Sequence, residues 1–233
     1  MNRRSQFGCG IAGLLGAALI LIGMIVADYL PPPKASWTAA HLAHFYASET
    51  DRIRVGLLLL FVGTCGWATL MAVVTVQLLR TEGRRPVLSV LQAVTGTATY
   101  VLLLLFTAIL SAAAFRPERP PEETQLLHDV GWFMAFLTAP AFVLQALAVG
   151  AAILADRTAK PVYPRWLGYV GIWAALLLAP GTILLFFHSG VFAYHGLISY
   201  WIPLFAFGGW MVAMSLGALL AAKADDATPT PVA

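Results

Sequence analysis

The sequence predicts an all-α polytopic membrane protein, a bundle of six transmembrane helices with a short interfacial helix in the first outer loop. Of the 233 residues, 60% are hydrophobic and only 11% are charged, whereas soluble domains are about half apolar and a quarter charged. The apolar residues fall into six runs of about 20 residues, the length of helix that crosses a hydrocarbon core. A helix is expected for each run, because it satisfies its own backbone polar groups in lipid.

All six runs belong to one predicted transmembrane domain, residues 1–223. They lie near residues 9–30, 54–79, 86–114, 130–155, 166–187 and 197–222. The first run follows a basic pair of arginines and lacks a small-residue cleavage site, which is typical of a retained anchor and not of a cleaved signal peptide. Residues 224–233 are polar and contain proline, so we expect a disordered cytoplasmic tail there.

The connections differ between the two sides of the bundle. LRTEGRRP (79–86) and DRTAKPVYPR (156–165) are short, and their glycine and prolines end one helix before the next begins. After three prolines, the segment SWTAAHLAHFYASETDR (36–52) offers Ser36 as an N-cap and about twelve residues for an interfacial helix. The charged stretch FRPERPPEETQLLHD (115–129) is expected to be a brief outer crossing, with His128 and Asp129 where the fourth span begins.

Basic residues determine the predicted orientation. Nine lie on the side of the termini: Arg3, Arg4, Arg80, Arg84, Arg85, Arg157, Lys160, Arg165 and Lys223. Five lie on the other side: Lys34, Arg52, Arg54, Arg116 and Arg119. By the positive-inside rule both termini are cytoplasmic. Because the basic residues are scattered over short loops, nucleic acid is not an expected partner.

The spans lack Asp, Glu, Lys, Arg and His near the midplane. Proton-coupled transporters and channels with charged filters keep such groups for function, and a cytochrome b type bundle places histidines within its spans. No GxSxG motif indicates a hydrolase. Gln145 is left as a polar group within the fourth span, either for an interhelical hydrogen bond or for a ligand contact.

Small residues and prolines within the spans predict how the helices pack. In the last span Gly209, Ala213, Gly217 and Ala221 recur every four residues, a ridge that allows close approach of another helix either within the bundle or in a dimer. Pro140 and Pro180 lie within the fourth and fifth spans and are expected to kink them.

Histidines and carboxylates gather on the outer side, and two interpretations remain open for them. The first is a metal site of imidazole and carboxylate ligands, for which the candidates are His41, His44, His128 and His188. The second is a polar lid over the bundle, in which Asp28, Arg54 and Asp129 or Arg116 pair with one another, because paired charges are less costly at a helix mouth.

Several segments resemble an uncharacterised group of bacterial six-span integral membrane proteins. They are PPPKASWTAAHLAHFYASETDRIRVG, QLLRTEGRR, FRPERPPEETQLLHDVGWF, DRTAKPVYPRWLGYVGIW and FFHSGVFAYHGLISYWIP. The resemblance implies a bacterial cytoplasmic (inner) membrane protein. In similar proteins Asn often stands in place of His128 and His195, so the resemblance favours a shared outer feature formed by Arg54, Arg116, Glu118, Arg119, Asp129 and Trp132.

Two functions follow from these observations. The first is a non-enzymatic binding or accessory component without a cofactor, which handles a lipophilic small molecule or a membrane partner in the lipid bilayer, as a homo-oligomer or with another membrane protein. It is favoured by an aromatic outer rim of Trp37, Phe45, Tyr46, Trp132, Phe192, Tyr194 and Trp201. The second is a membrane enzyme or redox subunit with a metal site on the outer face.

Overall fold

The protein is a bundle of six membrane-spanning helical segments, which confirms the predicted fold class. The computed structural model describes residues 3–137 and 139–224, so the predicted tail lies outside the described residues except for Ala224. The elements are α1 (Arg3–Val26), α2 (Ala39–Ser48), α3 (Thr50–Glu82), α4 (Val87–Phe115), α5 (Pro121–Phe136), α6 (Ala139–Ala155), α7 (Arg165–Leu178), the 3-10 helix η1 (Ala179–Phe186), the π-helix η2 (Leu197–Trp201) and α8 (Ile202–Ala224).

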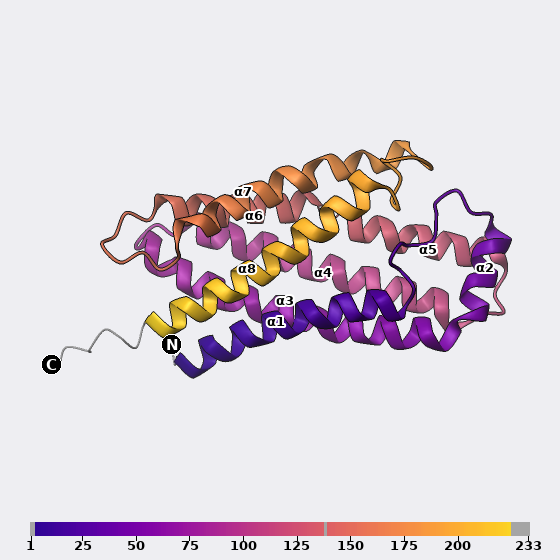
Figure 1. Ribbon diagram of the computed structural model, residues 1–233, viewed down its shortest axis with the longest axis horizontal. Helices are drawn as coiled ribbons and strands as arrows, with labels where there is room; N and C mark the ends of the chain where they lie inside the picture. The colour runs from indigo at the N-terminus through magenta and orange to yellow at the C-terminus, as the bar shows by residue number, and fades with distance from the viewer. Residues whose placement is uncertain (1–2, 138, 225–233) are drawn as a thin grey trace.

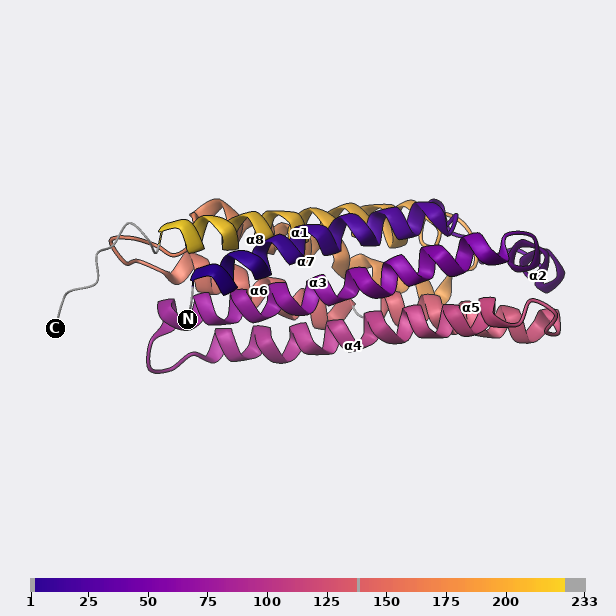
Figure 2. The same cartoon turned by 90° about the horizontal axis from the view of Figure 1, so that it is seen from below.

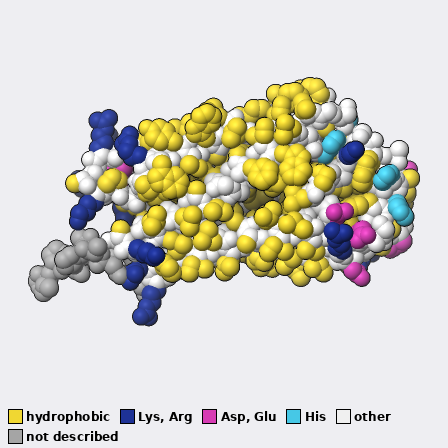
Figure 3. Space-filling model, in the orientation of Figure 1, with side chains coloured by type: hydrophobic (Ala, Val, Ile, Leu, Met, Phe, Trp, Pro, Cys, Tyr) yellow, Lys and Arg dark blue, Asp and Glu magenta, His cyan; other side chains and the backbone are white. Residues whose placement is uncertain are grey.

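The long helices run side by side along one axis (Figures 1 and 2). We call the end where α1 begins and α8 ends the terminal end, and the opposite end the distal end. The distal end carries α2, which lies across the bundle in Figure 1, and the connections 116–120 and 187–196. Hydrophobic side chains cover the surface between the two ends, while Lys and Arg gather at the terminal end and most acidic and His side chains at the distal end (Figure 3).

The first connection contains the predicted short helix, but the helix begins later than Ser36. Thr38 is the N-cap of α2, and its Oγ1 accepts a hydrogen bond from the backbone N–H of His41 at 3.3 Å. Leu42 and Tyr46 are buried, at 3% and 0% exposure. Therefore α2 packs on the bundle and closes part of the distal end.

The fourth span begins at Pro121, nine residues before the predicted residue 130. Pro121 occupies the first helical position, and Glu122 and Glu123 lie in the first turn. Proline is preorganised for that position, and acidic side chains there interact favourably with the helix dipole. The charged segment is therefore mostly helix, and His128 lies two turns inside α5 and is fully buried, contrary to the predicted position at the span entrance.

Three spans change their helical geometry in their distal halves. The fourth passes from α5 to α6 between Phe136 and Ala139. The fifth changes from α-helix to 3-10 helix at Ala179, next to Pro180, which lacks the N–H that an α-helix requires. The sixth begins with the π-helix η2. Pro140 lies in the first turn of α6, where proline is tolerated.

Glycines allow α1 and α3 to pack with their backbones in contact. A Cβ atom added to Gly66 would lie 2.5 Å from the carbonyl oxygen of Ala12 and 2.6 Å from Cα of Gly16. Gly56 and Gly23 meet in the same way nearer the distal end. Such contacts stabilise helix pairs in membranes, where van der Waals packing replaces the hydrophobic effect as the driving force.

The predicted small-residue ridge of α8 is divided between two environments. A Cβ atom at Gly217 would lie 2.4 Å from a side-chain carbon of Leu167, so this position packs within the bundle. At Gly209 an added Cβ would meet no atom within 4 Å. Only the part of the ridge near the terminal end therefore serves the internal packing of the chain.

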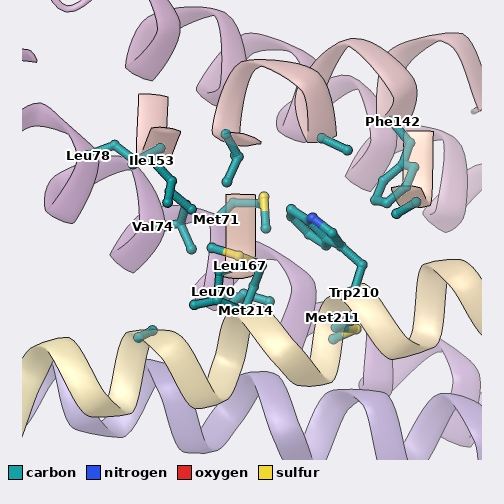
Figure 4. Packing of buried hydrophobic residues seen from close by; sticks show 14 of the residues in the cluster. Leu70, Met71, Val74, Leu78, Phe142, Ile153, Leu167, Trp210, Met211 and Met214 are labelled. Carbon is teal, nitrogen blue, oxygen red and sulfur yellow. The ribbon is translucent and has the colours of Figure 1, made fainter. Parts of the chain in front are cut away.

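The terminal half holds a hydrophobic core around Trp67, Met71 and Trp210 (Figure 4). Gln145 lies beside it and donates a hydrogen bond to Oε1 of Gln92 at 3.2 Å, which joins α6 to α4. The interhelical interpretation of Gln145 is thus confirmed.

A second buried amide lies nearer the terminal end. Gln77 of α3 donates to Oε1 of Gln6 at 2.8 Å and to the carbonyl oxygen of Ala218 at 3.1 Å, and it accepts from the hydroxyl group of Tyr163. Gln6 and Gln77 are fully buried, and Tyr163 is 1% exposed. This network ties α1, α3, α8 and the connection before α7 together.

Candidate functional site

The predicted polar lid is replaced by separate local pairs. Asp28 pairs with Arg52 at 3.6 Å and not with Arg54. Arg54 pairs with Asp51 at 3.3 Å. These side chains are largely exposed, and exposed ion pairs contribute little to stability. Asp129 is partly buried, and its Oδ1 accepts a hydrogen bond from the Tyr194 hydroxyl at 3.4 Å.

Two of the predicted arginines instead cap the C-terminus of α4. Arg54 donates to the carbonyl oxygens of Ala114 and Phe115 at 3.2 and 3.0 Å. Arg119 donates to the carbonyl oxygen of Ala112 at 2.9 Å and pairs with Glu123 at 3.6 Å. Helix C-termini leave carbonyl groups unsatisfied, and cations stabilise them. Both arginines thus have a structural role.

Two further charged candidates of the outer feature, Arg116 and Glu118, lie at the same corner. Arg116 and Glu118 are both exposed, and the Arg116 guanidinium lies 6.0 Å from the centre of the Phe115 ring. The structure therefore brings Arg54, Arg116 and Arg119 to the end of α4, apart from Trp132, which is buried in the bundle at 2% exposure.

The four histidines of the predicted metal site are not brought together. His41 and His44 are exposed on α2, His188 is exposed after η1, and His128 is buried. The His41 ring lies against that of Trp37, with ring centres 4.2 Å apart and planes tilted by 30°. Within residues 3–137 and 139–224, no group of three or more His, Cys, Asp or Glu side chains is placed to hold a metal ion.

The fifth histidine, His195, joins two distal connections. Its Nδ1 accepts a hydrogen bond from the backbone N–H of Ala35 at 3.2 Å. Partial burial and the nearby charge of Lys34 lower the pKa of His195. A neutral imidazole is the form that can accept this bond, so His195 acts as a structural contact.

Trp132 is the centre of a buried group that we call the distal aromatic cluster. Its members are Tyr29, Tyr46, Phe106, His128, Trp132, Tyr194 and Tyr200. The rings of Trp132 and Tyr194 are stacked 6.0 Å apart, and Tyr29 meets Trp132 edge-on at 5.5 Å. Tyr46 and Tyr194, which were predicted to belong to an aromatic outer rim, are 0% and 4% exposed and face inwards.

Two tyrosine hydroxyl groups of this cluster and His128 form a directed chain of hydrogen bonds. Tyr29 and Tyr46 hydroxyls lie 3.1 Å apart, and the Tyr46 hydroxyl lies 2.9 Å from Nδ1 of His128. Burial raises the pKa of Tyr29 and of Tyr46, so both stay neutral. Every hydroxyl finds an acceptor if Tyr29 donates to Tyr46 and Tyr46 donates to Nδ1. This assignment places the proton of the neutral imidazole on Nε2.

One face of α5 carries three buried polar atoms without a hydrogen-bond partner. They are Oγ1 of Thr124, Nε2 of His128 and Nε1 of Trp132. Their side chains are 1%, 0% and 2% exposed and are spaced four residues apart, so they lie in a row along the helix. Buried polar groups in native proteins almost always have a partner, which can be water or a ligand.

An apolar cavity of about 130 Å³ lies at the Trp132 end of this row. Residues of all six spans line it, and Trp132, Phe136, Leu178 and Tyr200 form its wall where three of the spans change geometry. Its few polar side chains include Thr64 and Thr107. The cavity thus lies between the two hydrophobic cores, in the part of the bundle where regular helix packing is interrupted.

A groove between α1 and α8 on the lipid-facing surface borders the cavity. The groove has a volume of about 380 Å³, and it shares Ile20, Leu204 and Phe207 with the cavity wall. Gly208 and Gly209 also line it, and an added Cβ at either would meet no atom within 4 Å. On this face the surface is hollowed near the middle of the bundle (Figure 3).

Apart from Trp132, none of the residues that line the cavity and its groove was predicted to be a site residue. Tyr29 and Tyr200 lie at span ends, and tyrosine there is typical of the interfacial belt, so their sequence context gives no indication of burial. Two signals were present in the sequence: Pro180 and Pro203 within the fifth and sixth spans, and the adjacent Gly208 and Gly209 of α8. Both are compatible with ordinary packing as well as with a cavity.

The fold and this site together define an integral membrane protein of six spans with an internal apolar cavity. Comparison of the chain with family models, with curated proteins and with solved structures found no match.

Proposed function

We propose that the chain is a non-enzymatic membrane protein that binds a lipophilic small molecule in its central cavity. The observation that carries the proposal is that the α1–α8 groove borders this cavity and shares three lining residues with it. We infer that a ligand dissolved in the bilayer enters the bundle there. Ligand sites in proteins are concave and mostly apolar, with a few placed polar groups, and this description fits the cavity.

The volume of the cavity limits the size of the ligand. A dry cavity of roughly 150 Å³ in another protein binds benzene, so the cavity here accommodates about one aromatic ring. Ligand pockets usually measure roughly 300–1,000 Å³, a range that the groove alone reaches. We therefore propose a molecule with a compact head in the cavity and an apolar chain in the groove.

Thr107→Leu should abolish the stabilisation of the protein by a small hydrophobe. Thr107 is fully buried in the cavity wall, and its hydroxyl donates only to Leu103 of its own helix, so leucine fills the cavity without breaking a bond between helices. α-Methylstyrene at about ten times its Kd should raise the unfolding midpoint of the wild type in nanodiscs by about 3–6 °C. The midpoint of Thr107→Leu should stay unchanged.

Thr97→Leu is the matched control. Thr97 lies on the same helix, is exposed, and donates to the carbonyl oxygen of Ala93 in the same way. This variant should retain the full shift of the wild type. A wild-type protein whose midpoint does not respond to the hydrophobe, or an equal response in all three proteins, would contradict the proposed site.

We further propose that the protein resides in a bacterial inner membrane with both termini in the cytoplasm. In a variant with both native cysteines replaced by serine, a cysteine at position 118 should react with a membrane-impermeant maleimide added to intact spheroplasts. A cysteine at position 160 should react only after lysis. Glu118 and Lys160 are both exposed, at opposite ends of the bundle, so the reverse labelling pattern would overturn the orientation.

A further inference from the structure

We propose that the ligand carries a hydrogen-bond acceptor, such as a ketone or quinone carbonyl oxygen, and that the indole N–H of Trp132 donates to it. This inference rests on the proposed function. It starts from Trp132, which lines the cavity and whose buried Nε1 has no hydrogen-bond partner.

The other polar groups around the cavity are already engaged as donors. Thr64 donates to the carbonyl oxygen of Phe61 at 2.7 Å, and Thr107 donates to that of Leu103 at 2.9 Å. The Tyr200 hydroxyl donates to the carbonyl oxygen of Tyr29. Trp132 is therefore the one lining side chain whose N–H is left without an acceptor among the residues that the structure describes.

The membrane makes this donor important for selectivity. Lipid chains are as apolar as the cavity, so moving an apolar ligand from the bilayer into the protein gains nothing from the hydrophobic effect. Discrimination must come from packing and from polar contacts. A carbonyl group in the hydrocarbon core lacks a donor, and an indole N–H is a donor only, so the two groups complement each other.

The row of unpartnered polar atoms on α5 indicates how the ligand is oriented in the cavity. His128 precedes Trp132 by one turn, and their ring centres are 6.1 Å apart. With the tautomer assigned above, Nε2 of His128 is a second unpartnered donor on the distal side of the cavity. The polar end of the ligand therefore faces the distal end, and its apolar chain extends into the groove towards the terminal end.

Acetophenone and α-methylstyrene provide a direct test, because they differ only in an oxygen atom in place of a CH₂ group. After correction for partition into empty nanodiscs, acetophenone should bind the wild-type protein about 2- to 10-fold more tightly than α-methylstyrene, the range expected for one hydrogen bond. Trp132→Phe removes the donor and keeps an aromatic ring. It should bind both compounds with the affinity that the wild type shows for α-methylstyrene.

Trp173→Phe is the control, because Trp173 is 64% exposed on the outer surface of α7, and it should keep the preference for acetophenone. Equal affinity of the wild type for the two compounds would overturn the inference and leave the proposed function intact. Binding of neither compound would overturn the proposed function as well.

A spectroscopic measurement covers the case in which Trp132→Phe does not fold. The carbonyl stretching band of acetophenone bound to the wild-type protein should lie at lower wavenumber than in empty nanodiscs, because a donated hydrogen bond weakens the C=O bond. An unshifted band for the bound compound would overturn the inference without any variant.

Discussion

Replacing Gly66 with valine should leave little folded protein. The added Cβ atom would lie 2.5 Å from the backbone oxygen of Ala12 and 2.6 Å from Cα of Gly16. Both are backbone atoms, which cannot relieve a clash by changing rotamer as a side chain can. Thus α1 must move away from α3. Overpacking typically costs about 1–3 kcal/mol, and here close backbone packing along the whole helix pair is lost as well. Monodisperse yield and the unfolding midpoint in detergent measure the effect.

Gly209→Val is the matched control for this substitution. Both glycines lie within long helices, but an added Cβ at Gly209 meets no atom within 4 Å, so its variant should unfold within a few degrees of the wild type. Gly66→Ala should be intermediate. Equal unfolding midpoints for Gly66→Val and Gly209→Val would show that the close contact between α1 and α3 is not required.

The second large effect is expected for Gln77→Met, which keeps the volume of the side chain and removes its amide group. Tyr163 then loses its acceptor, and the carbonyl oxygen of Ala218 loses the bond from Gln77. A buried polar group left unsatisfied costs about 1–3 kcal/mol. Bonds between membrane helices measure lower, at about 0.6 kcal/mol on average, so we expect a loss of about 2 kcal/mol in the free energy of unfolding.

A double-mutant cycle with Tyr163→Phe tests whether the network acts as one unit. Burial raises the pKa of Tyr163, so its hydroxyl is a neutral donor to Gln77. Tyr163→Phe alone should destabilise the protein, whereas in the Gln77→Met background it should have little further effect. Fully additive losses would mean that the two side chains stabilise the bundle independently.

The transmembrane architecture could be read from the sequence because length and hydropathy define a span regardless of its neighbours. Two kinds of helix boundary could not be predicted from the sequence. The fourth span begins at Pro121 because proline and two glutamates favour a helix start, although the same residues lower the hydropathy of the segment. The change to 3-10 geometry at Ala179 depends on packing as well as on Pro180.

The site was predictable only in part, because its residues come from distant segments of the chain. Trp132 was selected through a resemblance, and the structure places it in the cavity wall. Its neighbours Tyr29, Tyr194 and Tyr200 lie in three other segments, so nothing in local spacing indicates that they meet. For the charged candidates, the positions of the charges along the sequence indicated the end of the bundle at which they lie. Their hydrogen-bond partners could not be predicted, because Arg54 and Arg119 donate to carbonyl oxygens whose position depends on where α4 ends.

The opening of the α1–α8 groove on the lipid-facing surface also determines how affinity should be expressed. A ligand that enters from the bilayer reaches the protein at its mole fraction in lipid, and the aqueous concentration enters only through the partition coefficient. An apparent Kd in micromolar units will therefore rise in proportion to the amount of lipid in the assay. Values for different ligands become comparable once each is stated per mole of lipid.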